Sequence, residues 1–389
     1  MTDHPPAEVA SPRRVVVVGT GMIGTSVALA LRERGAEVWL ADRDPAAARL
    51  AADIGAGTLL PGGLGPGGRP GQDQPEGPAD LALLAVPPAA VAPTLAGAQA
   101  RNLARWYTDV ASVKGFPLAQ ARALGCDLAS FVAAHPLSGR ERSGPAAARA
   151  DLFLGRPWVI CPEADNPEAA VAAVTGLARA CGAEPVLVSA AQHDRWVALV
   201  SHAPHVVSAA MAARLADSSD GALALAGQGL RDVTRIAAGD SALWTQILAA
   251  NAAPVAEVLA AVAADLAAAA EDLAGAAAAE ASLGLGDPGA ALKVLAALLD
   301  QGSAGVARIP GKRGTPARGD AVVQVVIPDV PGELARLFDA AGQAGVNIED
   351  IGIEHSPGLP VGVAELTVRP EAVARLTEAL AAGGWPVRG

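Results

Sequence analysis

Residues 12–42 constrain the fold of this chain more than any other stretch. An apolar run at Val15–Val18 enters a glycine-rich turn, and a helical apolar pattern follows at Met22–Arg34. A second apolar run, Glu37–Ala41, ends on Asp42, 18 residues after the last glycine of the turn. The order strand, GxGxxG turn, helix, strand and acid is typical of the first βαβ unit of a dinucleotide-binding sheet.

The three glycines of the turn are expected to have different tasks. Gly19 permits the tight turn, Gly21 lets a pyrophosphate approach the backbone, and Gly24 lets the helix pack closely on the strand. The helix that follows offers free N–H groups and the positive end of its dipole to phosphates. A GxGxxG turn alone is a weak signal and can bind nothing, but here the flanking strand, helix and acid favour a dinucleotide.

Asp42 bears on which dinucleotide binds. Its carboxylate can accept hydrogen bonds from the ribose hydroxyls and repels a 2′-phosphate, which favours NAD over NADP. Arg43 follows directly and can partly reverse this preference. The predicted cofactor-binding residues are Gly19, Gly21, Met22, Ile23, Gly24, Asp42, Arg43, Val86 and Pro87.

Composition excludes several classes of protein. The chain has 389 residues, enough for two or three domains, and a net charge of -11, which argues against binding nucleic acid or an anionic membrane. Cys126, Cys161 and Cys181 are far apart, so neither a disulfide framework nor a thiolate metal site is indicated. The N-terminus has no signal-peptide pattern, and we expect a cytoplasmic protein without a metal.

The first 189 residues predict a Rossmann-type, doubly wound α/β domain. After the first two strands, further buried strands are expected, with alanine-rich helices between them, at 81–86, 106–110, 131–134, 158–161 and 185–188. Between them, Pro61–Pro78 has 12 Gly or Pro among its 18 residues and is expected to be a surface loop.

Two further domains are expected. Residues 190–301 show only helical patterns, including a long alanine-rich helix at Ala252–Ala281, and should form an all-helical domain. Such a domain after a dinucleotide-binding fold often supplies one side of the substrate pocket and a dimer interface. A linker is predicted at 302–319. Residues 320–389 then follow the order βαββαβ, which predicts a ferredoxin-like α+β domain.

Three polar clusters are candidates for the chemistry. Ser112 follows a strand, at the sheet edge where open α/β sheets bind ligands. His135, expected just beyond another strand, can take a proton from a substrate hydroxyl while hydride leaves the same carbon. Arg235, in the helical domain with Trp244 downstream, suits a bidentate contact with a substrate carboxylate.

Each of these residues also has a structural interpretation. Ser112 can cap a helix, His135 can be a hydrogen-bonded turn residue, and Arg235 can form a surface ion pair. The pair His193–Asp194 is interpreted as a helix-start cap rather than a catalytic dyad. His202 and His205, three residues apart, are expected in buried hydrogen bonds or an interface, because no carboxylate or cysteine pattern completes a metal site.

Together these motifs resemble the prephenate/arogenate dehydrogenase family of tyrosine biosynthesis. The matching segments are Gly-Thr-Gly-Met-Ile-Gly, Asp-Val-Ala-Ser-Val-Lys, His-Pro-Leu-Ser-Gly-Arg-Glu-Arg-Ser-Gly, Ser-His-Ala-Pro-His and Thr-Arg-Ile-Ala. The C-terminal Asp-Val-Pro-Gly-Glu-Leu and Gly-Val-Asn-Ile resemble an ACT domain, a module that binds amino acids. This second resemblance implies feedback regulation, with tyrosine as the expected inhibitor.

The family resemblance implies oxidative decarboxylation of prephenate with NAD, in a homodimer. His135 would be the base and Ser112 its helper, with Arg235, Glu141, Trp244 and Ser138 around the substrate. Arogenate remains the alternative substrate, because Glu141 can pair with its ammonium group. A β-hydroxyacid dehydrogenase is disfavoured, since no suitable lysine occurs between Ala190 and Leu292, and a non-catalytic NAD and amino-acid sensor is the other alternative.

Overall fold

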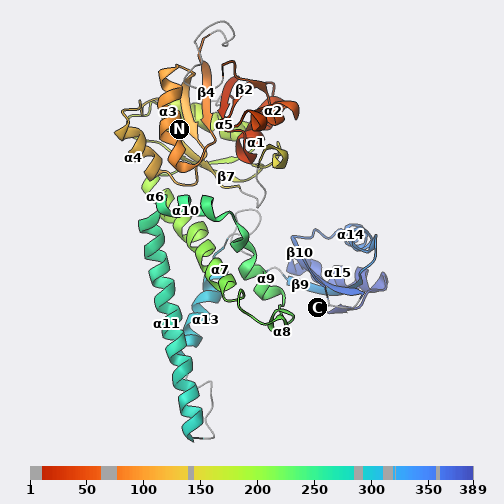
Figure 1. The fold of residues 1–389 in the computed structure, drawn as a ribbon. Coiled ribbons are helices and arrows are strands. Elements are labelled where there is room, and N and C mark those ends of the chain that lie inside the picture. Colours follow the sequence, from red (N-terminus) through yellow and green to blue (C-terminus); the bar gives the residue numbers. More distant parts are fainter. Residues whose placement is uncertain are drawn as a thin grey trace, which may run out of the picture. The chain divides into compact units, whose positions relative to one another are not determined.

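The computed structural model describes residues 11–62, 77–138, 144–283, 292–309, 319, 321–355 and 360–388. The chain divides into two units, Met1–Ala261 and Val262–Gly389 (Figure 1). Each unit is described by itself. The predicted active-site residues all belong to the first unit.

Unit 1 is built on one eight-stranded sheet. Its strands are β1 (Arg14–Val18), β2 (Glu37–Ala41), β3 (Thr58–Leu59), β4 (Ala79–Leu84), β5 (Ala104–Asp109), β6 (Phe131–Pro136), β7 (Pro157–Cys161) and β8 (Glu184–Leu187). Their order is β3-β2-β1-β4-β5-β6-β7-β8, and every neighbouring pair is parallel except β6 and β7. The predicted α/β sheet of Rossmann type is therefore confirmed.

Helices cover both faces of this sheet (Figure 1). One layer contains α1 (Met22–Glu33), α2 (Pro45–Asp53) and α5 (Glu168–Ala180), and the other contains α3 (Pro88–Ala100) and α4 (Gly115–Ala123). Alternate side chains of a strand point to opposite faces, so Val15 and Val17 pack in one core and Val16 and Val18 in the other. Burial on both faces explains why β1 is apolar throughout.

The Gly/Pro-rich segment lies in the connection between β3 and β4. Residues 63–76 of this predicted loop lie outside the described residues. β4 begins at Ala79 and ends at Leu84, two residues earlier at each end than the sequence predicts. This shift places Val86 and Pro87 in the turn that leads into α3.

The second half of unit 1 is helical, as predicted. Its elements are α6 (Ala190–Val197), η2 (Ala198–His202), α7 (Ala203–Ala213), α8 (Asp220–Leu223), α9 (Gln228–Thr234), η3 (Arg235–Ala238), α10 (Ser241–Ala250) and the start of α11 (Ala252–Leu283). Between α6 and α7 the helix widens into one π turn, η2. Pro204 explains this widening, because it has no N–H to donate to the preceding turn.

Unit 2 contains most of α11, whose helical prediction is confirmed, and α13 (Lys293–Val306). Asp272 of α11 accepts hydrogen bonds from the backbone N–H groups of Val294 and Leu295 at 3.0 and 3.1 Å, so it caps the start of α13. The linker predicted from Gly302 is wrong for its first residues, because α13 continues to Val306. Residues 310–318 lie outside the described residues.

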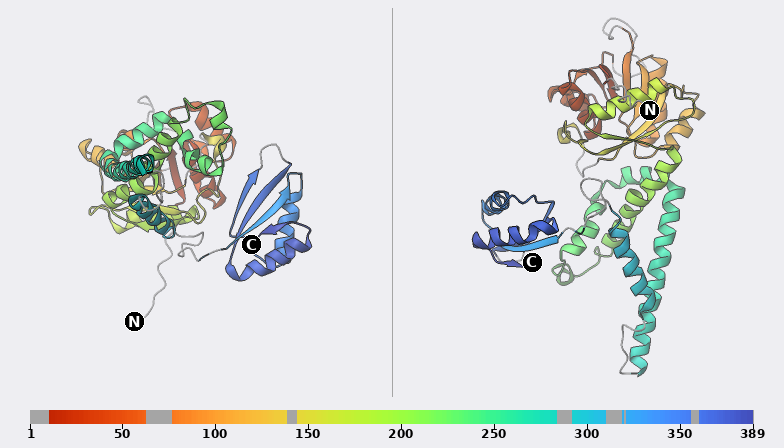
Figure 2. Two further views of the ribbon diagram at one scale, coloured as in Figure 1. Left: turned by 90° about the horizontal axis from the view of Figure 1, so that it is seen from below. Right: turned by 180° about the vertical axis from the view of Figure 1, so that it is seen from behind.

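The end of unit 2 is a four-stranded antiparallel sheet with two helices. Its elements are β9 (Ala321–Pro328), α14 (Glu333–Gln343), β10 (Asp350–His355), β11 (Val361–Val368), η4 (Pro370–Ala372), α15 (Val373–Ala382) and β12 (Val387–Arg388). The sheet order is β10-β11-β9-β12, and α14 and α15 pack on one face of it (Figure 2). The predicted order βαββαβ is confirmed. β10 starts at Asp350 rather than Val346, because Val346 packs into the core from the preceding turn.

Candidate active site

The glycine-rich turn at the end of β1 has the geometry that each glycine predicts. Gly19 has φ +99°, and an added Cβ would lie 2.1 Å from the carbonyl oxygen of Ala85. A Cβ on Gly24 would lie 2.0 Å from the Gly19 oxygen. At Gly21, in contrast, nothing lies within 4 Å of the added Cβ. The turn is therefore closed on the protein side and open at Gly21, where a ligand could approach the backbone.

Asp42 holds this turn in place. Its Oδ2 accepts hydrogen bonds from the backbone N–H of Thr20 at 2.6 Å and from the Thr20 hydroxyl at 2.9 Å. Its Oδ1 accepts from the N–H of Asp44 at 2.9 Å, and Arg43 is exposed beside it. No side chain caps the N-terminus of α1 at Gly21, so its first N–H groups are left for another acceptor.

The next part of the candidate site is the connection between β5 and α4. It begins with Asp109 and ends with Lys114, which form an ion pair with no exposure to solvent. The Lys114 ammonium donates to the carbonyl oxygen of Ala134 at 2.6 Å, and Asp109 Oδ1 accepts from the N–H of Ala134 at 3.0 Å. The pair therefore fixes both polar backbone groups of the residue before His135.

His135 lies inside β6, not beyond it as predicted, because β6 continues to Pro136 and pairs His135 with Val159. The side chain is half-buried, and its Nδ1 lies 3.0 Å from Nε2 of His193. Burial, and then the neighbouring His193, Lys114 and His202, hold the pKa of His135 well below its ordinary value. At neutral pH this imidazole is uncharged and can accept a proton.

His193 continues the chain of hydrogen bonds to a carboxylate. Its Nδ1 lies 2.8 Å from Oδ1 of Asp194, and the imidazole is fully buried. Burial raises the pKa of Asp194, but hydrogen bonds from His193 and from the N–H groups of Gly115 and Lys114 outweigh it, so the pKa is lowered. Asp194 is therefore ionised at neutral pH and acts only as an acceptor.

The predicted cap role of His193 and Asp194 is wrong. Helix α6 is capped by Ser189, whose hydroxyl accepts from the N–H of Gln192 at 3.3 Å. Asp194 instead accepts the N–H groups of Lys114 and Gly115, both at 2.8 Å, at the start of α4. A carboxylate from one helix thus caps another helix, because the two meet at the end of the sheet.

Ser112 lies between Asp109 and Lys114, in the connection that runs past Ala134. Its hydroxyl does not cap α4, since Lys114 is the N-cap residue and Asp194 supplies the acceptor. Ser138, two residues beyond β6, donates its hydroxyl to the Leu152 oxygen at 2.9 Å and anchors that segment. Glu141, predicted to be among the residues around the substrate, lies outside the described residues.

The helical part contributes a second buried group of side chains. Asn251 Nδ2 donates to the Asp194 carbonyl oxygen at 2.8 Å and lies 3.1 Å from Nδ1 of His202. Burial lowers the pKa of His202 to about 4. The Trp244 ring stacks on His205 with centroids 3.6 Å apart and meets His202 edge-on at 6.2 Å. These contacts connect Trp244, through His202 and Asn251, to Asp194. The hydrogen-bonded residues around His135 (His193, Asp194, Lys114 and Asp109) are called the His135 network below.

His202 and His205 are therefore placed in buried contacts, as the sequence predicts. Among the residues that the structure describes, no group of three or more His, Cys, Asp or Glu side chains is arranged to hold a metal ion. Arg235 lies on η3, which packs against α7, and its side chain is exposed. Its predicted contact with a substrate carboxylate remains a prediction.

Comparison with known proteins identifies the family. The profile described as "Prephenate dehydrogenase, nucleotide-binding domain" matches residues 27–187, and "Prephenate dehydrogenase, dimerization domain" matches residues 189–281. A probable prephenate dehydrogenase of Streptomyces niveus, NovF, is 42% identical over 96% of this chain and 99% of its own length. The chain belongs to the prephenate dehydrogenase family.

Solved structures of the family share the fold. An arogenate dehydrogenase of Synechocystis is 27% identical and superposes with a TM-score of 0.57 over 75% of this chain and 98% of its own. A prephenate dehydrogenase of A. aeolicus, solved with hydroxyphenyl propionate and NAD+, has 22% identity and a TM-score of 0.61 over 76% of this chain and 98% of its own. The Streptomyces relative matches nearly the whole chain, so its similarity extends into the C-terminal sheet.

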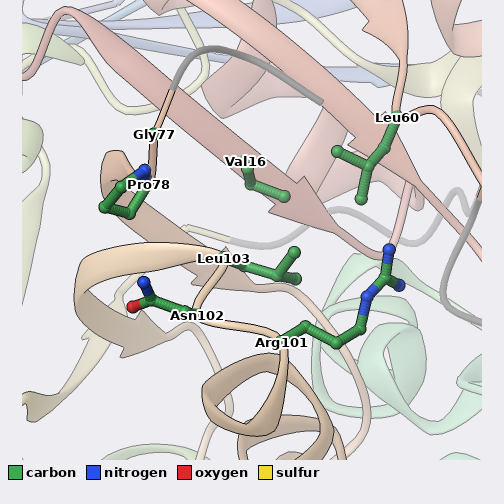
Figure 3. A pocket seen from close by; sticks show the side chains of 7 residues that line it. All are labelled: Val16, Leu60, Gly77, Pro78, Arg101, Asn102 and Leu103. Atoms are coloured by element: carbon green, nitrogen blue, oxygen red, sulfur yellow. The ribbon is translucent and has the colours of Figure 1, made fainter. Parts of the chain in front are cut away.

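One cavity of this family member lies away from the His135 network. It has a volume of about 140 Å³ and is lined by residues that include Gly77 and Pro78 before β4 and Arg101, Asn102 and Leu103 before β5 (Figure 3). These residues precede strands whose opposite ends carry Val86 and Asp109. The cavity is thus separate from the edge of the sheet that carries the predicted chemistry.

Sequence reasoning missed four residues that the structure places in the network: Asp109, Lys114, His193 and Asp194. Two of them were visible in the quoted Asp-Val-Ala-Ser-Val-Lys segment. A lysine that is buried needs an acceptor for its charge, and Lys114 follows a buried strand closely enough to be buried itself. Asp109, five residues earlier, is that acceptor. His193 and Asp194 carried no such local signal, because their partners are 58 and 80 residues away.

Proposed function

We propose that this family member catalyses the NAD-dependent oxidative decarboxylation of prephenate to 4-hydroxyphenylpyruvate. The observation that carries this proposal is the state of His135: a neutral imidazole with one nitrogen bonded to His193 and the other left for a substrate hydroxyl. The 42% identity with the Streptomyces relative over nearly both whole chains supports prephenate as the substrate class.

The residues at the end of β1 fit the cofactor. The open backbone at Gly21 and the uncapped start of α1 suit a pyrophosphate, and Val86 lies 3.3 Å from the position of an added Gly19 Cβ, at the side of the turn. Asp42 would face the ribose hydroxyls beside Thr20. When bound, NAD+ supplies the acceptor for the hydride that leaves the substrate carbon.

His135 would hold the substrate's ring hydroxyl through its free nitrogen and take its proton as hydride leaves the same carbon. The ring carboxylate departs as CO2, and its bonding electrons complete the aromatic ring. The resulting phenol oxygen recovers the proton from His135. The reaction as a whole therefore releases no proton, and His135 needs to hold it only through this step.

The remaining predicted residues have positioning roles in this proposal. Ser112 would bond the same hydroxyl and assist His135. Arg235 would hold a substrate carboxylate, with Trp244 along the helical side of the pocket. Ser138 already anchors its own segment through Leu152, so we expect it to shape the pocket rather than to react. Glu141 is proposed at the pocket mouth.

Arogenate is the second candidate substrate, and one structural neighbour, from Synechocystis, is an arogenate dehydrogenase with 27% identity. The deciding group would be Glu141, whose carboxylate could pair with the ammonium of arogenate. A β-hydroxyacid dehydrogenase remains disfavoured, because the helical domain has no lysine between Ala190 and Leu292. A non-catalytic sensor remains disfavoured because Ser112, His135 and Arg235 are all present.

The C-terminal sheet is proposed to be an ACT-like regulatory domain that binds tyrosine. Its βαββαβ order and the sheet order β10-β11-β9-β12 support a ferredoxin-like fold. Inhibition by tyrosine, the product of the pathway, would then reach the enzyme through this domain. The measurement is the rate with and without added tyrosine.

A cytoplasmic homodimer is proposed as the working form. Residues 189–281 match the family's dimerization domain, and apolar side chains on the helical part, such as Trp196, Leu199 and Val200, are 49–69% exposed. Helices Ala190–Ala213 and Ala252–Ala278 are long and apolar enough to cross a membrane by composition alone. We assign these apolar faces to packing between subunits, because both helices lie within the matched dimerization domain.

The test is NADH formation at 340 nm with prephenate and arogenate in parallel, each with NAD+ and NADP+. Turnover of prephenate with NAD+ is expected, and His135→Gln should lower kcat by about 10²–10⁴ if His135 is the base. Turnover of arogenate alone would exchange the substrate assignment. No turnover of either substrate by a folded protein that binds NAD would favour the sensor.

A further inference from the structure

We infer that His193 and Asp194 are positioning residues that hold His135 in one tautomer, with the proton on Nδ1 and the bare nitrogen Nε2 presented to the substrate. This inference rests on the proposed function for its catalytic meaning. The tautomer itself is a property of the protein without substrate. It can therefore be tested whether or not the proposed reaction is correct.

The direction of the two hydrogen bonds, between His135 and His193 and between His193 and Asp194, follows from the Asp194 carboxylate. Ionised Asp194 has no proton, so the contact at 2.8 Å requires His193 Nδ1 to be the donor. We take His193 to carry a single proton, on this Nδ1, and its Nε2 then has a lone pair. The 3.0 Å contact with His135 can be a hydrogen bond only if His135 Nδ1 carries the proton. Nε2 of His135 is left as the acceptor.

Asp194, the last member of this hydrogen-bonded series, is itself held by three groups besides His193. Both of its carboxylate oxygens accept backbone N–H groups at the start of α4, from Lys114 and Gly115. Asn251 donates to the backbone oxygen of Asp194. Asp194 therefore cannot turn away from His193 without breaking the cap of α4, and the orientation of His193 is fixed by the fold.

The same network also fixes the backbone on the other side of His135. Lys114 and Asp109 bond the carbonyl and the N–H of Ala134, and Lys114 is at the same time one of the N–H donors to Asp194. One buried cluster thus sets both the backbone position and the protonated nitrogen of His135. The cationic Lys114 nearby also disfavours a second proton on His135.

This arrangement has a consequence for the reaction. When His135 takes the substrate proton on Nε2, it becomes an imidazolium whose Nδ1–H still donates to His193. The Asp194 carboxylate at the far end stabilises that charge through His193. In the other tautomer Nε2 would carry a proton already, and His135 could not accept the hydroxyl proton.

The direct test is ¹⁵N NMR of the full-length protein labelled at histidine, without substrate, near pH 7.5. The chain has 6 histidines, and the His135 signals are assigned from their loss in His135→Gln. We expect a protonated Nδ1 and a bare Nε2 on His135. A protonated Nε2 on His135 in the unaltered protein would overturn the inference, whatever the enzyme's activity.

Two variants of His193 separate positioning from folding. His193→Gln keeps an oxygen that can accept from His135 Nδ1, whereas His193→Leu removes the acceptor. We expect kcat to fall about 10–10³-fold in the Leu variant, with KM changed less than threefold, and partial recovery in the Gln variant. The NMR signals of His135 in the Leu variant should show a mixture of tautomers.

The matched control is Arg195→Gln, an exposed position on the same helix two residues from His193. It should leave kcat, KM and the His135 signals unchanged. Thermal unfolding of all variants checks that they are folded. An unchanged kcat together with an unchanged His135 tautomer in a folded His193→Leu variant would contradict the inference. A changed tautomer in a protein inactive on both substrates would uphold it and reject the proposed function instead.

Discussion

Asp194 accepts the backbone N–H of Gly115 at 2.8 Å, 79 residues away along the chain. The contact joins α6, the first helix after the last strand of the sheet, to α4, the helix that follows β5 and Ser112. Through the neighbouring His193 it also reaches His135. The helical part of unit 1 therefore supplies both residues, His193 and Asp194, of the hydrogen-bonded series that begins at His135.

Gly21 can be separated from the other two glycines by substitution. A Cβ at this position meets nothing in the protein, so Gly21→Ala should fold with an unchanged Tm. The methyl group would lie where the backbone should approach a pyrophosphate, and we expect the Kd for NAD+ to rise by about tenfold or more, roughly 1.4 kcal/mol. Isothermal titration calorimetry with NAD+ measures this change in Kd.

Gly35→Ala is the control for Gly21→Ala. Gly35 also has open space for a Cβ, but it lies at the far end of α1 and has φ +81°. It should lose stability through backbone strain and keep its NAD+ affinity. If Gly21→Ala binds NAD+ as tightly as the unaltered protein, the cofactor does not approach this turn.

Arg235 provides a test of substrate binding. Replacing it with Gln removes a bidentate cation, and we expect KM for prephenate to rise about 10–10²-fold with a smaller effect on kcat. Arg231→Gln is the matched control, an exposed arginine one helical turn earlier. Equal effects of both substitutions would indicate a general loss of positive charge rather than a specific contact.

Asp42 could be predicted from the sequence because its spacing from the glycine-rich turn is a local signal, whereas the role of His193 could not. The βαβ unit, the sheet and the helical region were predictable because hydrophobic period and glycine spacing are local signals. Ser112 was found because it follows a strand, and His135 because it lies near the carboxyl end of one. His193 and Asp194 were misassigned, because the same residue types cap helices and form hydrogen-bonded series such as His135–His193–Asp194. Only the packing of α6 against α4 shows which role these two residues have.

The buried pair Lys114 and Asp109 should dominate the stability of unit 1 near the site. Lys114→Met leaves the Asp109 carboxylate buried without its cation, and we expect a loss of about 3–5 kcal/mol in the free energy of unfolding. Adding Asp109→Leu should recover part of that loss, because the uncompensated charge is removed. Denaturant unfolding of the two variants measures both steps.

The double variant also checks the role of the pair in catalysis. Even where its stability recovers, it lacks the two hydrogen bonds that hold Ala134 before His135. We therefore expect kcat to remain low in a folded protein. A double variant with full activity would show that the pair serves only the fold.

His202 gives the prediction for pH. Burial lowers its pKa to about 4 in the folded chain, compared with 6.5 when unfolded, so between these values the unfolded state binds more protons. The free energy of unfolding should therefore fall as the pH is lowered from 6.5 towards 4, by up to about 3 kcal/mol from this residue. Replacing His202 with Gln, which can still accept from Asn251, should flatten this part of the profile. Urea unfolding at pH 7.5, 6, 5 and 4 measures the difference between the two proteins. If both profiles fall in parallel, the acid sensitivity comes from other groups, and the buried neutral state of His202 is not what limits stability at low pH.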